Sequence, residues 1–264
     1  MINPNNLREI LYNISKKTIL PSFGNLAENQ ISYKNGKDIV TDTDISVETE
    51  LSTLLPKLLK NSQFIGEETY TKSPSILNYY LSGQYCWTVD PIDGTSNFAK
   101  SNERFAVMVA LTKYKKIIQS FIYKPITEEF MTADRTGTFL DNKKITLSKR
   151  TKIENANGSI SLKYWDEGKK KKIITIKDKF KNINSYGSIG CEYFDIALGI
   201  RDFALLSRLY PWDHIPGVFI VRQAGGHDCH FDKIEYKFYK NSKNLIVSNS
   251  MNLNYEILNI IEEK

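Results

Sequence analysis

The middle of the chain carries a pattern that predicts a run of β-strands. Residues 105–125 (FAVMVALTKYKKIIQSFIYKP) and 128–145 (EEFMTADRTGTFLDNKKI) contain apolar and β-branched stretches separated by turn residues. The shorter segment 86–90 (CWTVD) predicts another strand before them. Residues 6–19 and 45–60 instead have apolar side chains at helical spacing. A chain with this pattern is expected to form an antiparallel or mixed sheet packed against helices.

The pattern changes at about residue 150, where strands and helices follow one another. The segments concerned are two predicted strands, 158–162 and 245–249, and three predicted helices, 192–200, 214–226 and 253–264. We therefore predict two parts, an N-terminal α+β domain over 1–147 and a C-terminal α/β domain over 148–264.

Length and composition are ordinary for a globular protein. The chain has 264 residues, of which 41% are hydrophobic and 25% charged, and its net charge is +6. No secretory signal or bilayer-spanning stretch is recognisable, and Cys86, Cys191 and Cys229 are too widely spaced for a disulfide framework. The basic run 168–172 (GKKKK) is interpreted as an exposed turn, because no nucleic-acid-binding motif accompanies it. We expect a cytoplasmic protein with no nucleic-acid or membrane partner.

Two aspartates lie unusually close together after the predicted strand at 86–90. In WTVDPIDGTSNF, Asp90 and Asp93 are three residues apart, with a proline between them and a glycine after them. Further acidic groups occur at 38–44 (DIVTDTD), 66–68 (GEE) and 212–213 (WD). Each could be a turn, a helix cap or a solvated surface group on its own. Together, at strand and helix ends, they are the oxygen ligands that Mg²⁺ requires.

These residues resemble the inositol monophosphatase family. The resemblance rests on four motifs in the same order: 38–44, GEE at 66–68, DPIDGT at 90–95, and Trp212-Asp213 followed by Ala224-Gly-Gly226. It covers roughly residues 5–260 and implies the five-layered α/β/α/β/α sandwich shared with fructose-1,6-bisphosphatase. It also implies an enzyme that hydrolyses phosphomonoesters.

The resemblance also implies two or three Mg²⁺ ions and a set of ligands for them. Glu67, Asp90 and the backbone carbonyl of Ile92 would hold one ion. Asp90, Asp93 and Asp213 would hold a second, so that Asp90 bridges the pair. Most of these ligands lie in the N-terminal domain, and the C-terminal domain contributes Asp213 and the substrate pocket. We expect Asp93→Asn to lower kcat by orders of magnitude.

By the same resemblance, the backbone N–H groups of Gly94 and Thr95 would bind the phosphate, as a helix N-terminus favours. Thr95 and Glu67 would orient and deprotonate a water activated by the metal, and Asp44 would hydrogen-bond Thr95. Glu68 would have a supporting role near the metals. The expected reaction is direct hydrolysis without a covalent phosphoenzyme.

Two other interpretations of single motifs are weaker. The segment DTDIS from Asp42 resembles the motif of haloacid-dehalogenase-type phosphatases, in which the first aspartate is the nucleophile, but the later motifs of that family are missing. His214 lies beside Asp213, where a general acid could stand. The family needs no histidine there, so we assign His214 a packing or supporting role.

The substrate is the least determined feature. Inositol-specific members have a glutamate several residues before the WD aspartate, whereas 205–211 here contains no acid. Glu192 could replace that carboxylate or simply begin a helix, and Arg208 could meet a second anionic group. We expect inositol monophosphate or a related sugar or polyol phosphate. Histidinol phosphate, fructose 1,6-bisphosphate and nucleotide phosphates are alternatives. Nucleotide phosphates are disfavoured, because bisphosphate nucleotidases of the family usually read DGTKEF where this chain reads DGTSNF.

A non-catalytic protein that binds a phosphorylated metabolite or a protein partner is the remaining alternative. It is disfavoured because none of the expected metal ligands is substituted. The family resemblance further implies a homodimer and inhibition by lithium.

Overall fold

The structure is a computed structural model that describes residues 1–34, 38–147, 151–240 and 242–263. The N-terminal half forms a seven-stranded sheet in the order β3-β4-β5-β6-β7-β8-β9. β3 and β4 are parallel, and the later neighbours are antiparallel. The strands are β3 (Gln63–Gly66), β4 (Tyr85–Asp93), β5 (Ala106–Lys113), β6 (Lys116–Lys124), β7 (Glu129–Asp134), β8 (Gly137–Leu140) and β9 (Lys143–Ile145).

Side chains of this sheet alternate between two buried faces, as the period of two along a strand requires. In β5, Val107 and Val109 belong to one apolar cluster, whereas Ala106 and Met108 belong to another. A strand that is buried on both faces needs an almost continuous apolar sequence, which explains FAVMVAL.

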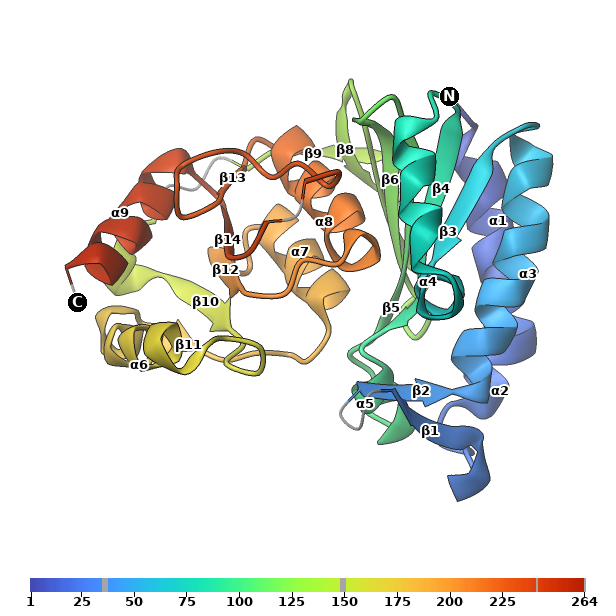
Figure 1. The fold of residues 1–264 in the computed structure, drawn as a ribbon, viewed down its shortest axis with the longest axis horizontal. Helices are drawn as coiled ribbons and strands as arrows, with labels where there is room; N and C mark the ends of the chain where they lie inside the picture. The colour runs from blue at the N-terminus through green and yellow to red at the C-terminus, as the bar shows by residue number, and fades with distance from the viewer. Residues whose placement is uncertain (35–37, 148–150, 241, 264) are drawn as a thin grey trace.

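Helices cover both faces of the large sheet (Figure 1). α1 (Pro4–Ile14) and α3 (Asp42–Leu58) pack on one face. α7 (Ile189–Ala197) and α8 (Pro211–Gln223) pack on the other. α1 continues through a π-helical turn, Ser15–Ile19, into the short α2 (Leu20–Ser22).

The C-terminal half forms a five-stranded mixed sheet in the order β11-β10-β12-β14-β13. Ala204 and Val247 pack toward α7 and α8, whereas Leu205 and Ile246 belong to a third apolar cluster with the outer helices. The elements are β10 (Asn157–Ile160), β11 (Asn182–Ile183), β12 (Phe203–Leu206), β13 (His227–Cys229), β14 (Leu245–Ser248), α6 (Glu167–Thr175) and α9 (Met251–Glu262).

The elements thus form five layers: two helices, the large sheet, two helices, the small sheet and two outer helices (Figure 1). This arrangement confirms the predicted α/β/α/β/α sandwich. The two sheets draw their strands from either side of residues 148–150, which lie outside the described residues. The domain boundary at 147/148 falls beside that segment and stays a prediction.

Short elements lie beside the ends of β3 and β4. α4 (Glu67–Lys72) follows β3 directly, and α5 (Thr95–Ala99) follows β4 after Gly94. A separate two-stranded hairpin consists of β1 (Ile31–Lys34) and β2 (Asp38–Thr41), and α3 begins at its end. The 3₁₀ turns are Glu28–Gln30, Pro74–Leu81, Ile153–Asn155 and Lys177–Lys179.

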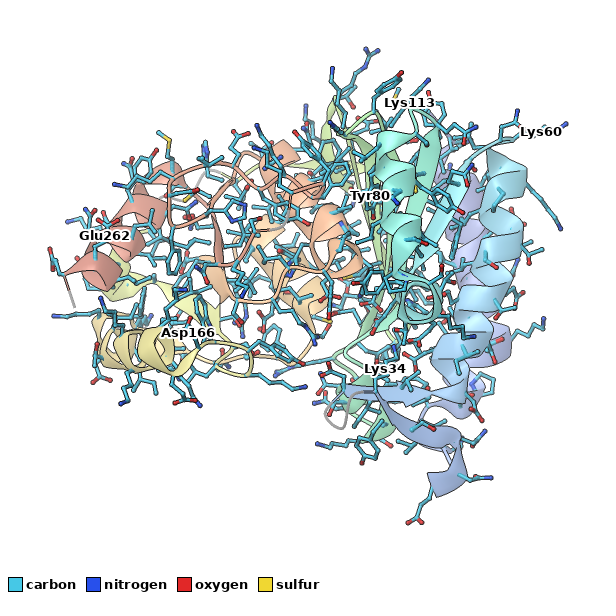
Figure 2. All side chains as sticks on the ribbon, viewed as in Figure 1. Lys34, Lys60, Tyr80, Lys113, Asp166 and Glu262 are labelled. Atoms are coloured by element: carbon cyan, nitrogen blue, oxygen red, sulfur yellow. The ribbon has the colours of Figure 1, made fainter. Side chains whose placement is uncertain are left out.

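The interpretation of 168–172 as a turn was wrong, because these residues are part of α6. Asp166, labelled in Figure 2, caps the helix by accepting a hydrogen bond from the backbone N–H of Lys169. Ile173 is buried on the inner side. Hydrophobic periodicity does not predict this helix, because the lysine run contains no apolar residue.

Two further sequence-based expectations can be compared with the structure. Cys86, Cys191 and Cys229 are free and buried. Within the described residues, no helix has both the length and the apolar character needed to cross a membrane.

Candidate active site

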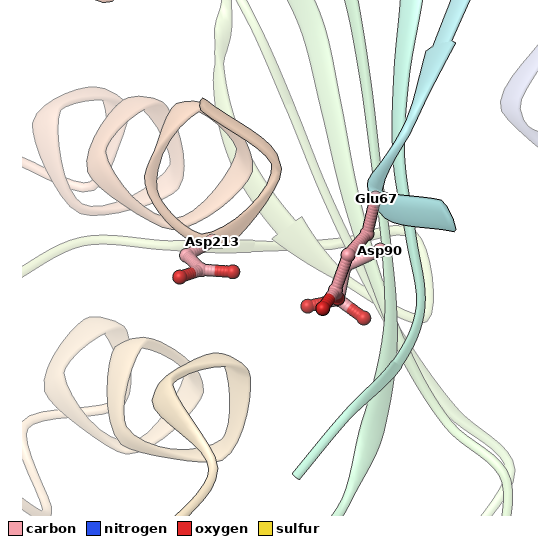
Figure 3. A group of neighbouring side chains, drawn as sticks. All are labelled: Glu67, Asp90 and Asp213. Carbon is pink, nitrogen blue, oxygen red and sulfur yellow. The ribbon is translucent and has the colours of Figure 1, made fainter. Parts of the chain in front are cut away.

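Three carboxylates from distant parts of the chain meet between the large sheet and α8. Glu67, Asp90 and Asp213 each place a carboxylate oxygen so that all three atoms lie within 4.8 Å of one another. Figure 3 shows Glu67 and Asp90 side by side, with Asp213 pointing toward them from α8. The sequence predicted each of these residues as a metal ligand, and the fold brings them together.

The backbone at the end of β4 explains how Asp90 and Asp93 can lie so close in sequence. Pairing with β5 is regular up to Asp90 and shifts its register before Asp93. Such an irregularity redirects side chains that would otherwise alternate across the sheet. The backbone N–H of Ile92 donates a hydrogen bond to Asp90 Oδ1 over 3.1 Å, which fixes the bend.

Glu67 is positioned by a buried glutamate that the sequence analysis did not single out. Glu48 Oε2 accepts a hydrogen bond from the backbone N–H of Glu68 over 2.7 Å. Glu48 Oε1 accepts bonds from the backbone N–H and the hydroxyl of Thr69. A Cβ at Gly66 would collide with the Glu48 carboxylate, so glycine permits this approach. Glu48 thereby anchors the first turn of α4, where Glu67 lies.

The predicted hydrogen bond between Thr95 and Asp44 is present. The Thr95 hydroxyl lies 3.0 Å from Asp44 Oδ1 and 3.0 Å from the carbonyl oxygen of Ile92. The other oxygen of Asp44 accepts bonds from the backbone N–H and hydroxyl of Thr41, which caps α3. Asp44 therefore ties the start of α3 to the turn that follows β4.

Asp93 makes a different set of contacts from the other acids. It accepts hydrogen bonds from the hydroxyl of Ser188 and from the backbone N–H groups of Ile189 and Gly190, at the start of α7. Asp93 is not part of the group formed by Glu67, Asp90 and Asp213. Asp93 therefore links the end of β4 in the large sheet to the start of α7.

Gly94 allows the sharp turn between β4 and α5. Its φ of +90° lies in the left-handed region. A Cβ there would also approach Ser188 Cβ to 2.9 Å and the carbonyl of Arg104 to 3.0 Å. Gly94, Thr95 and Ser96 line the same cavity as the carboxylates.

The acidic groups raise one another's proton affinity. Burial raises the pKa of Asp90 well above its usual range, and the charges of Glu67, Asp93 and Asp213 raise it further. Loss of hydration also raises the pKa of Asp213 well above its usual range, with a further contribution from Glu67. Such a group is stabilised in its charged form by a cation.

One protein cation already contacts this cluster. The Lys34 ammonium, at the end of β1, lies 3.0 Å from Glu67 Oε1 and also contacts Glu68. Burial raises the pKa of Glu68, and the hydrogen bond from Lys34 only partly offsets this, which leaves it at about 7. Lys34 precedes the 38–44 motif by four residues, and no pattern in the sequence marked it.

The carboxylates line a cavity of about 380 Å³. Glu192 and Arg208, the two candidate substrate residues, both line it. Glu192 is buried, and its Oε1 accepts hydrogen bonds from the Ser185 hydroxyl and the backbone N–H of Tyr186. Its carboxylate therefore holds the loop before α7.

Arg208 is held by contacts that cross the site. Its Nη1 donates to Asp38 Oδ2 over 2.6 Å. Its guanidinium carbon lies 3.8 Å from the ring centroid of Tyr164 and 4.8 Å from that of Tyr210. Asp38 also accepts bonds from Lys163 and Tyr164. Burial favours the neutral acid, but these bonds outweigh it and hold the pKa of Asp38 below its usual range.

His214 has the packing role expected of it. Its Nδ1 pairs with the Tyr193 hydroxyl over 2.8 Å and its Nε2 with the carbonyl oxygen of Arg208 over 2.7 Å. Burial lowers the pKa of His214 to about 4. A histidine with both nitrogens occupied holds α7 and α8 together.

The structure does not support Asp42 as a nucleophile or Asp213 as a helix cap. Asp42, the candidate nucleophile, is exposed as the first residue of α3 and is not among the residues that line the cavity. Asp213 is not a helix cap, because α8 begins at Pro211. Asp213 instead lies in the first turn, from which its side chain reaches the site.

Similarity to known proteins identifies the family of this chain. The profile of the Inositol monophosphatase family matches residues 5–264. The chain is also 30% identical over 209 residues to the inositol monophosphatase of Dictyostelium discoideum, covering 76% of this chain and 75% of that protein. The chain belongs to the inositol monophosphatase family. It is therefore a phosphoric monoester hydrolase by family.

Solved structures agree on the fold of this inositol monophosphatase family member. An IMPase of Thermotoga maritima superposes with a TM-score of 0.81 at 24% identity, over 98% of this chain and 96% of that one. An IMPase/NADP phosphatase described as complexed with Mg²⁺ and phosphate superposes with a TM-score of 0.82 at 20% identity, over 97% and 93% of the two chains.

Proposed function

We propose that the protein hydrolyses small phosphomonoesters in a Mg²⁺-dependent reaction, with inositol monophosphate or a related polyol or sugar phosphate as substrate. The observation that carries this proposal is the meeting of Glu67, Asp90 and Asp213 within 4.8 Å on the wall of a cavity. The cavity volume of about 380 Å³ suits a phosphate with a small leaving group.

The donor set fits Mg²⁺. All its members are oxygen atoms, and burial and mutual repulsion leave the carboxylates in need of positive charge. Glu67, Asp90 and the carbonyl of Ile92 would hold one ion, and Asp90, Asp93 and Asp213 a second. When bound, these ions would offset the charge of the phosphate and make a nearby water more acidic. A third ion, inhibition by lithium, a homodimer and a cytoplasmic location remain family-based expectations.

The protein's own groups would orient the reactants. The backbone N–H groups of Gly94 and Thr95, two residues that line the cavity, would bind the phosphate. Thr95 and Glu67 would hold the attacking water and accept its proton. Asp44 keeps the Thr95 hydroxyl in place. The water oxygen forms a bond to phosphorus as the ester P–O bond breaks, and the leaving oxygen takes up a proton. No covalent phosphoenzyme is needed.

A phosphate-release assay on the purified protein tests the proposal. The panel is inositol 1-phosphate, fructose 1,6-bisphosphate, histidinol phosphate, 3′-phosphoadenosine 5′-phosphate and NADP, each with Mg²⁺ and with EDTA. Release that EDTA abolishes supports the reaction, and the preferred ester identifies the substrate branch. No release from any ester, with Mg²⁺ still bound, would favour the non-catalytic alternative.

A further inference from the structure

The cavity that holds the proposed metal ligands is also lined by cations. Among the described residues these are Lys163 and Arg208. Lys163 follows β10 and Arg208 follows β12, and the two strands are parallel neighbours in the small sheet. Segments that follow parallel neighbours leave a sheet at the same edge, which explains why both side chains reach one cavity. A substrate whose phosphate lies among the carboxylates can therefore present its leaving group to these cations.

Both cations are already paired with an acid from the other half of the chain. Asp38, at the start of β2, accepts a hydrogen bond from Lys163 Nζ over 2.7 Å and one from Arg208 Nη1 over 2.6 Å. The Tyr164 hydroxyl donates to the same carboxylate. Asp38 lines the cavity together with these three partners. One carboxylate thus occupies a donor of each cation at the cavity wall.

Asp38 lowers the positive charge that this wall offers to a ligand. Lys163 and Arg208 alone would present two positive charges, whereas with Asp38 the group has a single net positive charge. A phosphate group carries about −1.5 to −2 charges at neutral pH. A second phosphate on the substrate would be repelled by the Asp38 carboxylate and would compete with it for the same donors. An uncharged leaving group has neither disadvantage.

The same wall keeps groups that bind hydroxyls. An ionised carboxylate can accept about four hydrogen bonds, and Asp38 accepts three from its partners, so a substrate hydroxyl can donate the next. Ser161 and Ser207 also line the cavity and can donate or accept. The wall therefore suits a polyol better than a second anion.

We propose that Asp38 determines the substrate specificity of this site, selecting phosphomonoesters of an uncharged polyol over esters that carry a second phosphate. This inference rests on the proposed function and deepens it by assigning the preference to one residue. It differs from the expectation that Arg208 meets a second anionic group of the substrate, because Arg208 has a carboxylate partner within the protein.

Two inositol esters that differ by one phosphate test this inference. Initial rates of phosphate release are measured with Mg²⁺ for inositol 1-phosphate and inositol 1,4-bisphosphate, for the wild type and for Asp38→Asn. Asparagine keeps the size of the side chain and removes its charge. The ratio of kcat/KM for the bisphosphate to that for the monophosphate should rise about tenfold in the variant. Asp38→Ser, which is also uncharged, should raise the ratio in the same direction.

A second substitution shows whether the change acts through the cations. The Lys163 side chain is 50% exposed, so Lys163→Gln should be tolerated by the fold. In Asp38→Asn/Lys163→Gln the wall regains the net charge of the wild type, and the ratio should return to within about threefold of the wild-type value. A ratio that stays as high as in Asp38→Asn would overturn the role assigned to the charge of Asp38.

Asp42→Asn is the matched control. Asp42 is exposed, follows Asp38 by four residues, and is not among the residues that line the cavity. The substitution changes the net charge of the protein equally, so the ratio should stay within about twofold of the wild type. An equal rise in this control would mean that overall charge, rather than the cavity wall, sets the preference, and would overturn the inference.

The same rates separate this inference from the proposed function. Hydrolysis of inositol 1-phosphate with the same ratio in the wild type, Asp38→Asn and Asp38→Ser would overturn the inference alone. Absence of hydrolysis of both esters by the wild type would overturn the proposed function and the inference together.

Discussion

At the scale of single residues, the Thr95 hydroxyl carries much of the proposed chemistry. It lies within hydrogen-bond distance of both Asp44 and the Ile92 carbonyl, which connects a helix start to a proposed metal ligand. Thr95→Val keeps the shape but removes the hydroxyl, and we expect kcat to fall by about 100-fold or more. Thr95→Ser restores the hydroxyl and should recover activity to within about tenfold of the wild type.

Steady-state phosphate release from the preferred ester measures both variants. A valine variant as active as the serine variant would exclude a role for the hydroxyl.

Asp93 has a second testable role at this scale. Asp93→Asn removes a charge proposed to face the second ion, and kcat should fall by about 100-fold or more. Ser188→Ala removes only one hydrogen bond to that carboxylate and keeps its charge, so its kcat should remain within about tenfold of the wild type. Near wild-type turnover of Asp93→Asn would show that Asp93 is not a ligand of the catalytic metal.

At the scale of elements, Glu48 joins α3 to α4. Its carboxylate accepts three hydrogen bonds from residues 68 and 69. Glu48→Gln replaces one acceptor with a donor that faces these N–H and O–H groups. We expect the free energy of unfolding to fall by about 1–3 kcal/mol, together with weaker Mg²⁺ binding, because Glu67 loses its support.

Urea denaturation and Mg²⁺ titration test this expectation, with Glu50→Gln as the control. Glu50 lies two residues further along α3 and forms a 3.6 Å ion pair with the exposed Lys17. Its loss should cost less than about 1 kcal/mol. Equal effects of the two substitutions would show that Glu48 does not support Glu67.

The sequence predicted the long, strongly periodic elements well. The helix expected over 45–60 is α3 (Asp42–Leu58), and the strand expected over 86–90 is part of β4 (Tyr85–Asp93). The hairpin β1–β2 and helix α6 were missed, because their residues are short or polar and give little period. In α6 the signal was the cap at Asp166 rather than any hydrophobic face.

The proposed metal ligands were predictable for a different reason. They lie in contiguous motifs that resemble those of the inositol monophosphatase family, so the resemblance implied them without any knowledge of distance. Glu48 and Lys34 were missed because each matters only through partners that are far away in the chain. Glu48 contacts residues 20 and 21 positions later, and Lys34 contacts residues 33 and 34 positions later.

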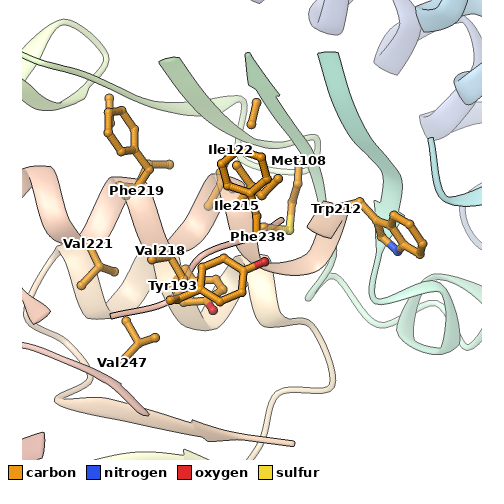
Figure 4. Close-up of a cluster of buried hydrophobic side chains, with 14 of the residues drawn as sticks. Met108, Ile122, Tyr193, Trp212, Ile215, Val218, Phe219, Val221, Phe238 and Val247 are labelled. Carbon is orange, nitrogen blue, oxygen red and sulfur yellow. The ribbon is translucent and has the colours of Figure 1, made fainter. Parts of the chain in front are cut away.

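At the scale of the whole molecule, one buried cluster joins the two sheets through the central helices. Figure 4 shows Met108 and Ile122 of the large sheet, Ile215 and Val218 of α8, and Val247 of the small sheet in this cluster. Because the cluster fixes α8 against the large sheet, it also fixes Asp213 opposite Glu67 and Asp90. The acidic site is therefore held by the packing of the entire protein.

Burial of the acidic residues in and around the site should lower the stability of the fold when no metal is present. Burial raises the pKa of Asp44 to about 7 and that of Asp93 to about 6. Between about pH 4 and pH 7 the native state keeps protons that the unfolded chain has released, so the free energy of unfolding falls as pH rises. In EDTA we expect Tm to drop by a few degrees from about pH 5 to about pH 8.

Thermal unfolding at several pH values, with EDTA or with Mg²⁺, checks this. Mg²⁺ should reduce the drop, because a bound cation stabilises the ionised carboxylates, and Asp44→Asn should reduce it in EDTA by removing one titrating group. A Tm that rises with pH in EDTA, or identical curves with and without Mg²⁺, would contradict the expectation.

The most direct measurement is phosphate release from inositol 1-phosphate during a Mg²⁺ titration, for the wild type and for Asp213→Asn. The account predicts activity that requires Mg²⁺ in the wild type, and a variant that needs at least about tenfold more Mg²⁺ and reaches a much lower maximum. An Asp213→Asn protein with the wild-type Mg²⁺ dependence and turnover would show that the meeting of Glu67, Asp90 and Asp213 is not the catalytic metal site.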